Sequence, residues 1–293
     1  MKILLTGAAG LVGRALTPAL TAAGHTVVKL SRGGAAPSWN PAAGSCDAAE
    51  LAGCEGVIHL AGEGIADGRW TAAKMQRIRD SRVNGTKLLC ETLARLPTPP
   101  QVLLSASAIG WYGDRGAEEL SETAAPGAGF LADVCQRWEL ATQPLAATGA
   151  RVVNTRIGVV ISRDGGALKK MLLPFQLGVG GILGGGKQYM SWIAIDDIVG
   201  ALLHLLKTDV RGPVNLTAPT PLSNYGFMKT LGKVLGRPTI FPLPAFAARL
   251  AFGKMADEIL LTGQRVLPKQ LQAGGYQFRY PDLETALKHV LGK

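Results

Sequence analysis

The chain has 293 residues, of which 47% are apolar and 18% charged, and its net charge is +10. This composition is typical of a globular protein, and the length allows one large core or a domain with a smaller lobe. Lys and Arg are spread along the chain without a basic stripe or a binding motif, so the sequence predicts no nucleic-acid partner.

The sequence predicts neither a signal peptide nor a membrane-spanning helix. The chain begins directly on a short apolar strand, without the basic region of a signal peptide, and no apolar run reaches the length of a membrane span. We therefore expect a cytoplasmic protein with no membrane partner. The four cysteines and four histidines show no metal-ligand spacing, which predicts reduced thiols and no metal.

The first 24 residues predict a strand, a glycine turn and a helix. Residues 2–5 are an apolar run of strand length, and residues 14–23 carry apolar side chains at helical spacing. Between them, Gly7 permits a tight turn, Gly10 lets the backbone approach a pyrophosphate, and Gly13 lets the helix pack closely on the strand. Phosphates would bind at the helix N-terminus. The expected cofactor contacts in this turn are Gly7, Ala9, Gly10, Leu11, Val12 and Gly13.

A second strand, residues 26–30, completes the βαβ unit that a dinucleotide site requires. The alternative is a purely structural glycine turn. Sites for NAD usually place Asp or Glu after this strand, whereas Ser31 and Arg32 stand here. Arg32 suits a 2′-phosphate, so the sequence predicts NADP (NADPH); a solvated loop arginine is the alternative.

The chain continues as alternating strands and helices. Residues 33–45 predict a loop, 56–62 a buried strand, 70–96 a helix and 101–105 another strand. This alternation predicts an α/β protein with a doubly wound parallel sheet. Ligands bind at the carboxyl ends of such strands, so we expect Leu60, Ala61, Gly62 and Glu63 to lie against the cofactor. His59, inside an apolar run, is expected to be a core residue.

At this point the chain resembles the extended short-chain dehydrogenase/reductase superfamily, the group of sugar-nucleotide epimerases and dehydratases. The matching pieces are the glycine turn, residues 60–62, Asn84-Gly85-Thr86, Ser105-Ala106-Ser107 and Tyr112-Gly113. Residues 191–197, 267–269 and 280–281 resemble its poorly characterised "epimerase family" branch, which has a small C-terminal domain. The resemblance covers essentially the whole chain and implies a Rossmann fold, NADP, and further cofactor contacts at Arg82, Ser105 and Ile157.

The chain departs from the superfamily at the catalytic helix. There a Ser or Thr, a Tyr and a Lys four residues later carry the chemistry: the tyrosine moves a proton, and the lysine lowers its pKa and holds the nicotinamide ribose. Ser107 occupies the place of the serine. Counting back from Glu139 puts Leu131 at the tyrosine position and Cys135 at the lysine position, and neither can do that work.

Other residues are candidates to replace the missing pair. Tyr225 and Lys229 have the right spacing, but they lie in the segment expected to form the second lobe, so we take them for a chance match. Tyr112 follows the same strand as Ser107 and is our candidate acid/base, with aromatic stacking as its alternative role. Glu63 and Asp196 are predicted near strand ends, with cofactor binding and helix capping as their alternatives.

The rest of the chain predicts the second lobe. Residues 165–186, rich in glycine, are expected to form a mobile wall of the substrate cleft, and Trp192 is expected either at its rim or in the core. Residues 246–261 have apolar residues at helical spacing, which we assign to the lobe core rather than to a membrane-binding face. The predicted division is 1–165 with 190–217 for the Rossmann domain, and 166–189 with 218–293 for the substrate lobe.

Three functions remain open at this stage. The first is an NADP-dependent oxidoreductase or epimerase acting on a small hydroxyl or carbonyl compound, including a nucleotide sugar, with Ser107 and Tyr112 as catalytic residues. The second is a non-catalytic NADP(H)-binding redox sensor that lacks the proton-transfer pair; a scaffold with a vestigial site is a third. The resemblance also implies a homodimer formed through residues 70–96 and 129–147.

Overall fold

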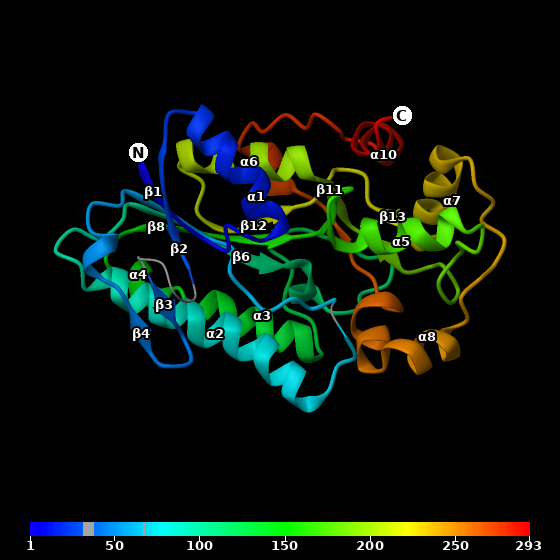
Figure 1. Ribbon diagram of the computed structural model, residues 1–293, viewed down its shortest axis with the longest axis horizontal. Helices are drawn as coiled ribbons and strands as arrows, with labels where there is room; N and C mark the ends of the chain where they lie inside the picture. The colour runs from blue at the N-terminus through cyan, green and yellow to red at the C-terminus, as the bar shows by residue number, and fades with distance from the viewer. Residues whose placement is uncertain (32–37, 67) are drawn as a thin grey trace.

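The computed structural model describes residues 1–31, 38–66 and 68–293. Six parallel strands form the central sheet in the order β12-β8-β6-β5-β1-β2 (Figure 1). The strands are β1 (Lys2–Thr6), β2 (Thr26–Leu30), β5 (Gly56–His59), β6 (Val102–Ala108), β8 (Arg151–Ile157) and β12 (Gly212–Leu216). The chain reverses its direction of winding between β1 and β5, and ligands of such sheets bind in the crevice at that point.

Helices cover both faces of the sheet (Figure 1). The helices of one face are α1 (Leu11–Ala22) and α6 (Ile195–Lys207), and those of the other are α2 (Ala72–Ala94), α3 (Phe130–Leu140) and α4 (Gln143–Ala146). Alternate residues of β1 enter separate cores: Ile3 and Leu5 pack with α1 and α6, whereas Leu4 packs with α2. Coverage on both faces explains why the strands are continuous apolar runs. The predicted fold class is confirmed.

The C-terminal half adds a smaller set of elements beside the sheet. Its helices are α5 (Gly166–Gln176), α7 (Asn224–Leu235), α8 (Ala245–Phe252), the π-helix η3 (Ala256–Leu260), α9 (Lys269–Ala273) and α10 (Leu283–Leu291). Its strand pairs are β9 (Val159–Ile161) with β11 (Trp192–Ala194), β10 (Tyr189–Met190) with β13 (Leu222–Ser223), and β14 (Arg265–Val266) with β7 (Glu119–Leu120). The predicted boundaries between the two parts stay a prediction.

Three expectations from the sequence need correction. Most of the first half of segment 165–186 is the helix α5, which buries Leu168 and Phe175 in the second core. The end of the predicted loop 33–45 contains a short hairpin of β3 (Trp39–Asn40) and β4 (Ser45–Cys46), held because Trp39 is buried. Residues 246–261 form a core only in part: Ala248, Met255 and Ala256 are buried, whereas Phe246 and Leu250 on α8 are 73% and 74% exposed.

Other details follow the sequence more closely. Trp192 is completely buried and its indole N–H donates to the Thr220 carbonyl, so it belongs to the core. The single-turn helices are η1 (Ala49–Leu51) and η2 (Ile109–Tyr112). Within the described residues, no helix combines the length and apolarity needed to cross a membrane. The homodimer through α2 and α3 stays a prediction.

Candidate functional site

The glycine turn between β1 and α1 is shaped by close backbone contacts. Gly7 has φ of +70°, and a Cβ there would stand 2.7 Å from the backbone carbon of Leu60. A Cβ on Gly13 would collide with the Gly7 carbonyl oxygen, so only glycine lets α1 pack this close to β1. The turn therefore lies directly against the end of β5, as the motif predicts.

The N-terminus of α1 is suited to an anion. Its N-cap is the exposed Gly10, which offers no side-chain acceptor, and the first turn contains no acidic residue. In the described chain, no side-chain acceptor caps the N–H groups of Leu11, Val12 and Gly13. The Arg14 guanidinium donates to the Ala9 carbonyl at 2.8 Å and adds positive charge beside the turn. Free N–H groups and the helix dipole both favour a phosphate here.

The residues after β2 are only partly within the described chain. Ser31 forms an isolated bridge with Ser38, and its carbonyl accepts the Trp39 N–H at 2.9 Å. Arg32, the predicted partner of a 2′-phosphate, lies outside the described residues. On α1, the Leu11 side chain points toward Gly165, the N-cap of α5. The glycine turn therefore lies next to the C-terminal half of the chain.

A buried polar network fixes the end of β5. The Thr6 hydroxyl oxygen accepts the N–H groups of Leu60 and Ala61 at 3.1 and 3.2 Å. Its proton is then donated to His59 Nδ1, 2.7 Å away, so the opposite nitrogen of the ring carries the hydrogen and donates to the Thr86 hydroxyl at 2.9 Å. His59 is completely buried, and burial lowers its pKa from 6.5 to about 4. His59 is therefore a neutral core histidine, and through Thr6 it helps to hold the carboxyl ends of β1 and β5 in place.

This network predicts sensitivity to acid. The unfolded chain binds a proton at His59 near its ordinary pKa of 6.5, whereas the folded chain resists it down to about 4, so stability falls as pH drops through this window. When the pH is lowered from 7 to 4.5, the free energy of unfolding of the wild type should fall by about 2–3 kcal/mol more than that of His59→Gln, because glutamine does not titrate. Urea denaturation at both pH values measures this difference. Equal losses in the two proteins would contradict it.

Arg82 is brought to the end of β5 from α2. Its guanidinium donates to the carbonyls of Glu63 and Ile78 at 3.0 and 3.2 Å, and a Cβ on Gly62 would stand 3.3 Å from its central carbon. The guanidinium also lies 5.1 Å from the Trp138 ring centre. Burial lowers the pKa of Arg82, and among the described residues no carboxylate lies within ion-pair distance. An arginine in this setting is a strong candidate to bind an oxygen-rich ligand.

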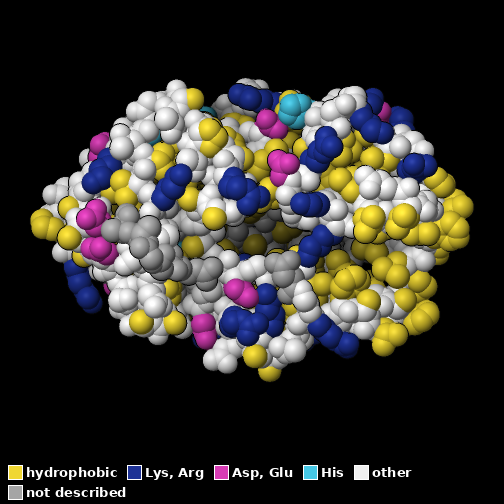
Figure 2. All heavy atoms as spheres, viewed as in Figure 1, with side chains coloured by type: hydrophobic (Ala, Val, Ile, Leu, Met, Phe, Trp, Pro, Cys, Tyr) yellow, Lys and Arg dark blue, Asp and Glu magenta, His cyan; other side chains and the backbone are white. Residues whose placement is uncertain are grey.

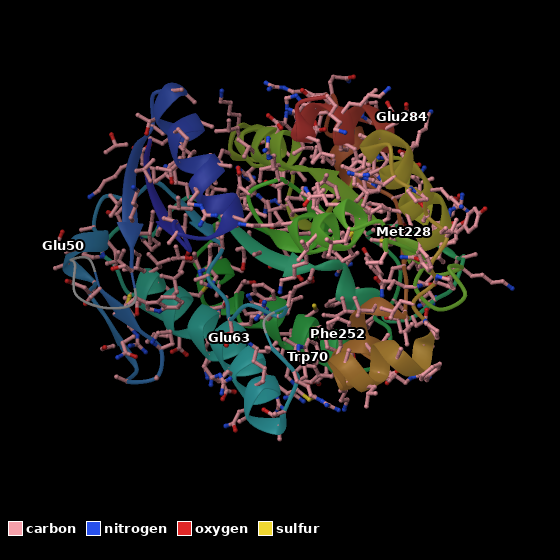
Figure 3. All side chains as sticks on the ribbon, turned by 45° about the vertical axis from the view of Figure 1, so that its right-hand side comes forward. Glu50, Glu63, Trp70, Met228, Phe252 and Glu284 are labelled. Carbon is pink, nitrogen blue, oxygen red and sulfur yellow. The ribbon has the colours of Figure 1, made fainter. Side chains whose placement is uncertain are left out.

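Glu63, labelled in Figure 3, offers its carbonyl to Arg82, but its carboxylate is paired with two other cations. Its carboxylate accepts a hydrogen bond from the buried Lys74 ammonium at 2.8 Å and lies 3.6 Å from Arg77. The hydrogen bond from Lys74 lowers the pKa of Glu63, with the charge of Arg77 adding to the effect. The sequence analysis did not identify Lys74. A lysine on the inward-facing side of a helix could have indicated it, because lysine is seldom buried without a partner.

Ser107 is held by a buried ion pair that the sequence analysis did not find. The Ser107 hydroxyl donates to Glu139 Oε1 at 2.7 Å. Arg156 binds both oxygens of the same carboxylate, at 2.8 and 3.0 Å, and its guanidinium lies 3.9 Å from the Trp111 ring centre. Burial opposes the charge of Arg156, but its bonds to Glu139 outweigh burial and raise its pKa. An arginine inside a strand of the central sheet, β8, was the available signal, because a charge buried there needs a partner.

Tyr112 belongs to the same network, and its geometry disagrees with the role expected from sequence. The side chain is completely buried. Its hydroxyl donates to Asn215 Oδ1 at 2.7 Å and accepts from Arg156 at 3.0 Å. Burial raises its pKa, an effect only partly offset by Arg156. Because the hydroxyl is completely buried and its single proton goes to Asn215, it has no proton to give to a substrate in this geometry, and the structure does not favour the acid/base role expected of Tyr112.

The positions counted for the missing tyrosine and lysine lie on α3 and face the same region. A Cβ on Gly110 would stand 3.2 Å from Leu131 Cβ and 3.7 Å from Cys135 Sγ, so α3 packs tightly under η2. Burial raises the pKa of Cys135 to about 12, which keeps the thiol neutral. Glu258 of η3 accepts the N–H of Leu131 at 3.4 Å and closes the N-terminus of α3. Neither side chain can supply the fixed positive charge of the superfamily lysine.

Of the remaining candidates, Ser105 and Ile157 lie on the same two strands as Ser107 and Arg156, and the others lie on different elements. Ser105 is buried within β6, and Ile157 is at the end of β8, paired with Ala108 of β6. Asp196 accepts a hydrogen bond from His289 at 3.1 Å rather than capping α6. Tyr225 is 54% exposed on α7, where the Lys229 ammonium donates to the Thr239 carbonyl. This placement supports reading the Tyr225 and Lys229 spacing as a chance match.

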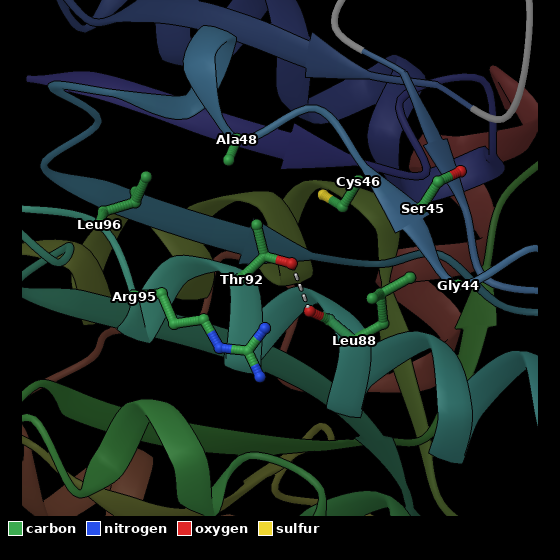
Figure 4. A pocket seen from close by; sticks show the side chains of 8 residues that line it. All are labelled: Gly44, Ser45, Cys46, Ala48, Leu88, Thr92, Arg95 and Leu96. Carbon is green, nitrogen blue, oxygen red and sulfur yellow. Dashed lines mark hydrogen bonds between the residues drawn. The ribbon is translucent and has the colours of Figure 1, made fainter.

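The surface is hollowed near the middle of the face shown in Figure 2. A separate cavity of about 360 Å³ lies between the β3–β4 hairpin and the C-terminal half of α2 (Figure 4). It is lined by Cys46, Thr92 and Arg95 among others, and by no residue of the glycine turn. We therefore do not assign the dinucleotide to this cavity. Among the described residues, no cluster of side chains could hold a metal ion.

Comparison with known proteins agrees with this geometry. Residues 3–217 match the model of the "NAD dependent epimerase/dehydratase family", and residues 243–290 match a "Domain of unknown function (DUF1731)". The chain is 43% identical to "Epimerase family protein Mb2239" of Mycobacterium bovis, over 98% of this chain and 97% of that protein. It is 37% identical to "Epimerase family protein SDR39U1" of Homo sapiens, over 99% of this chain and all of that protein.

Solved structures show the same relationship. The crystal structure of human epimerase family protein SDR39U1 (isoform 2) with NADPH matches with a TM-score of 0.91 at 34% identity, covering 100% of this chain and 99% of that one. A nucleoside-diphosphate sugar epimerase from Corynebacterium glutamicum matches with a TM-score of 0.81 at 36% identity, over all of this chain and 58% of that one. The superfamily resemblance expected from the sequence is confirmed. With its glycine turn, its parallel sheet and this family match over most of its length, the chain belongs to the NAD dependent epimerase/dehydratase family.

Proposed function

We propose that this chain is an NADPH-dependent oxidoreductase that acts on a small hydroxyl or carbonyl compound. The observation that carries the proposal is the N-terminus of α1, where an exposed glycine N-cap and an acid-free first turn leave N–H groups for a pyrophosphate. When bound, the nicotinamide would exchange a hydride with the substrate. The four free cysteines suit a reducing compartment, so a cytoplasmic location is part of the proposal.

NADPH is proposed over NADH for two reasons. The sequence after β2 offers Arg32 and no acidic residue for the adenosine ribose. The human relative with the similar fold was crystallised with NADPH. At the other end of the dinucleotide, we propose that Arg82 binds nicotinamide-ribose oxygens, since its unpaired charge lies at Gly62 and next to the α3 position where the superfamily has its lysine.

On the substrate side, Ser107 is proposed as a binding contact. Its proton is committed to Glu139, so its oxygen can only accept a hydrogen bond, which suits a substrate hydroxyl. Tyr112 is proposed to hold Arg156 and Asn215 in place rather than to move a proton. The similar structure of a nucleoside-diphosphate sugar epimerase makes a nucleotide-linked sugar one substrate class to test first.

A second function is favoured by a specific observation. The tyrosine and lysine positions hold Leu131 and a neutral Cys135, so the pair that would move the proton is replaced by apolar packing. A chain that binds NADPH without turning it over would act as a redox sensor. The two functions share the cofactor site and differ in whether any substrate oxidises the bound NADPH.

Calorimetric titration with NADPH and NADH tests the shared step. The wild type should bind NADPH more tightly, and Arg32→Ala should reduce its NADPH affinity to the NADH level, because the 2′-phosphate loses its partner. Arg82→Gln should weaken both cofactors alike, because the ribose contact is common to them. Binding of neither cofactor by the wild type would refute the proposal. Loss of NADPH absorbance with carbonyl compounds then separates oxidoreductase from sensor.

A further inference from the structure

The C-terminal half presents an apolar surface that the fold leaves uncovered. Seven large apolar side chains there are between 54% and 74% exposed. They lie on α5, on α8, in the segment after α5 and in the segment before α8. We call this surface the docking face: Leu173, Leu177, Val179, Ile240, Phe241, Phe246 and Leu250. Apolar side chains gather at the corresponding end of the molecule, with Lys and Arg along their margin (Figure 2). Exposed apolar side chains gathered in this way mark interaction sites.

The three segments of the docking face are joined by backbone contacts. The Leu243 N–H donates to the Ile182 carbonyl at 2.8 Å, and the Gly184 N–H donates to the Leu243 carbonyl at 2.9 Å. A Cβ on Gly181 would collide with the Phe241 carbonyl, so a glycine permits the two segments to touch. Leu173 of α5 and Leu177, the C-cap of that helix, lie four residues apart and share one exposed side. The face is therefore one continuous structure.

The charged side chains of the two segments that build the docking face are all basic. Segments 165–195 and 218–256, which build it, contain Lys and Arg but no Asp or Glu. Two of the cations are paired from outside these segments, Lys233 with Glu284 and Arg249 with Asp257. Others have no carboxylate partner among the described residues: Lys169, Lys187, Lys229, Arg237 and Lys254. The face thus combines protruding apolar side chains with unpaired positive charge.

We propose that the docking face binds the surface of an anionic lipid bilayer. Phe246, Leu250 and Phe241 would enter the boundary between headgroups and acyl chains, while the surrounding cations lie beside lipid phosphates. A second copy of this chain is a poorer partner, because its own net charge of +10 would set like charges against each other across the contact. The binding is peripheral, since the face is built from separate short segments.

Co-sedimentation of the full chain with vesicles tests the proposal. Vesicles containing phosphatidylglycerol should bind the wild type at least roughly tenfold better than phosphatidylcholine alone, and raised salt should weaken this binding. Phe246→Glu with Leu250→Glu should reduce binding at least roughly tenfold. The matched control is Leu140→Glu on α3, a 65% exposed apolar residue outside the docking face, which should bind as the wild type does.

Other outcomes overturn the proposal. Absence of wild-type binding to anionic vesicles, or equal loss in the Leu140→Glu control, would refute it. A third outcome would assign the docking face to a second copy of the chain. In it, light scattering finds the wild type as a dimer and Phe246→Glu with Leu250→Glu as a monomer, and the wild type does not bind vesicles. Arg237→Glu with Lys254→Glu provides an independent variant that leaves the apolar residues in place and should abolish the preference for anionic lipid. NADPH titration of each variant checks that the fold is intact.

Discussion

Replacing Arg156 with methionine is expected to lower the free energy of unfolding by about 3–5 kcal/mol, because it leaves the Glu139 carboxylate buried without its counter-ion. The Arg156 side chain is 3% exposed and that of Glu139 is 10% exposed, so water cannot replace the lost contact. The substitution also removes the donor to the Tyr112 hydroxyl and the cation over the Trp111 ring. Urea denaturation followed by circular dichroism measures the change.

The double variant Arg156→Met with Glu139→Leu provides the control. It removes both charges, so it should be more stable than the sum of the two single changes predicts, by about 1–3 kcal/mol. A loss below about 1 kcal/mol in Arg156→Met would contradict the view that this pair is buried and tightly bound. Additive effects would show that Arg156 and Glu139 act separately, and that Ser107 is held by something other than their joint geometry.

Replacing Gly10 with glutamate is expected to weaken NADPH binding at least roughly 100-fold, which corresponds to about 2.7 kcal/mol. Gly10 is exposed and has φ of −73°, a conformation open to any residue, and its Cβ would meet only the Gly7 carbonyl oxygen, at 3.2 Å. The new carboxylate would occupy the N–H groups proposed for the pyrophosphate and repel its charge. The change should therefore affect binding much more than folding.

Ala22→Glu is the matched control for this experiment. It places the same charge on an exposed residue at the opposite end of α1, away from the glycine turn. Calorimetric titration should give it the affinity of the wild type within about threefold, while thermal denaturation shows whether either variant is destabilised. If Gly10→Glu also retained near wild-type affinity, the pyrophosphate would not bind at the α1 N-terminus, and the proposed function would fail with it.

Features that depend on a few neighbouring residues could be predicted from the sequence. The turn at Gly7, Gly10 and Gly13 needs only local backbone freedom, and the alternation of apolar strands with helices is written in the spacing of side chains. These patterns predicted the parallel sheet, the resemblance of motifs along the chain indicated the superfamily, and both predictions are confirmed. The loss of the Tyr and Lys pair was also visible, because it needed only the positions of Leu131 and Cys135 on one helix.

Features that depend on distant residues could not be predicted in this way. Tyr112 was expected at a substrate, but Asn215, 103 residues later, accepts its proton, and no local pattern reveals that pairing. The periodicity at Phe246 and Leu250 was correctly helical, yet periodicity cannot say whether an apolar side of a helix is covered. Sequence spacing determined the elements of this protein and its glycine turn, because these obey short-range backbone geometry. Only the tertiary structure decided which polar groups are satisfied and which apolar side chains are exposed, because burial is a property of the assembled chain.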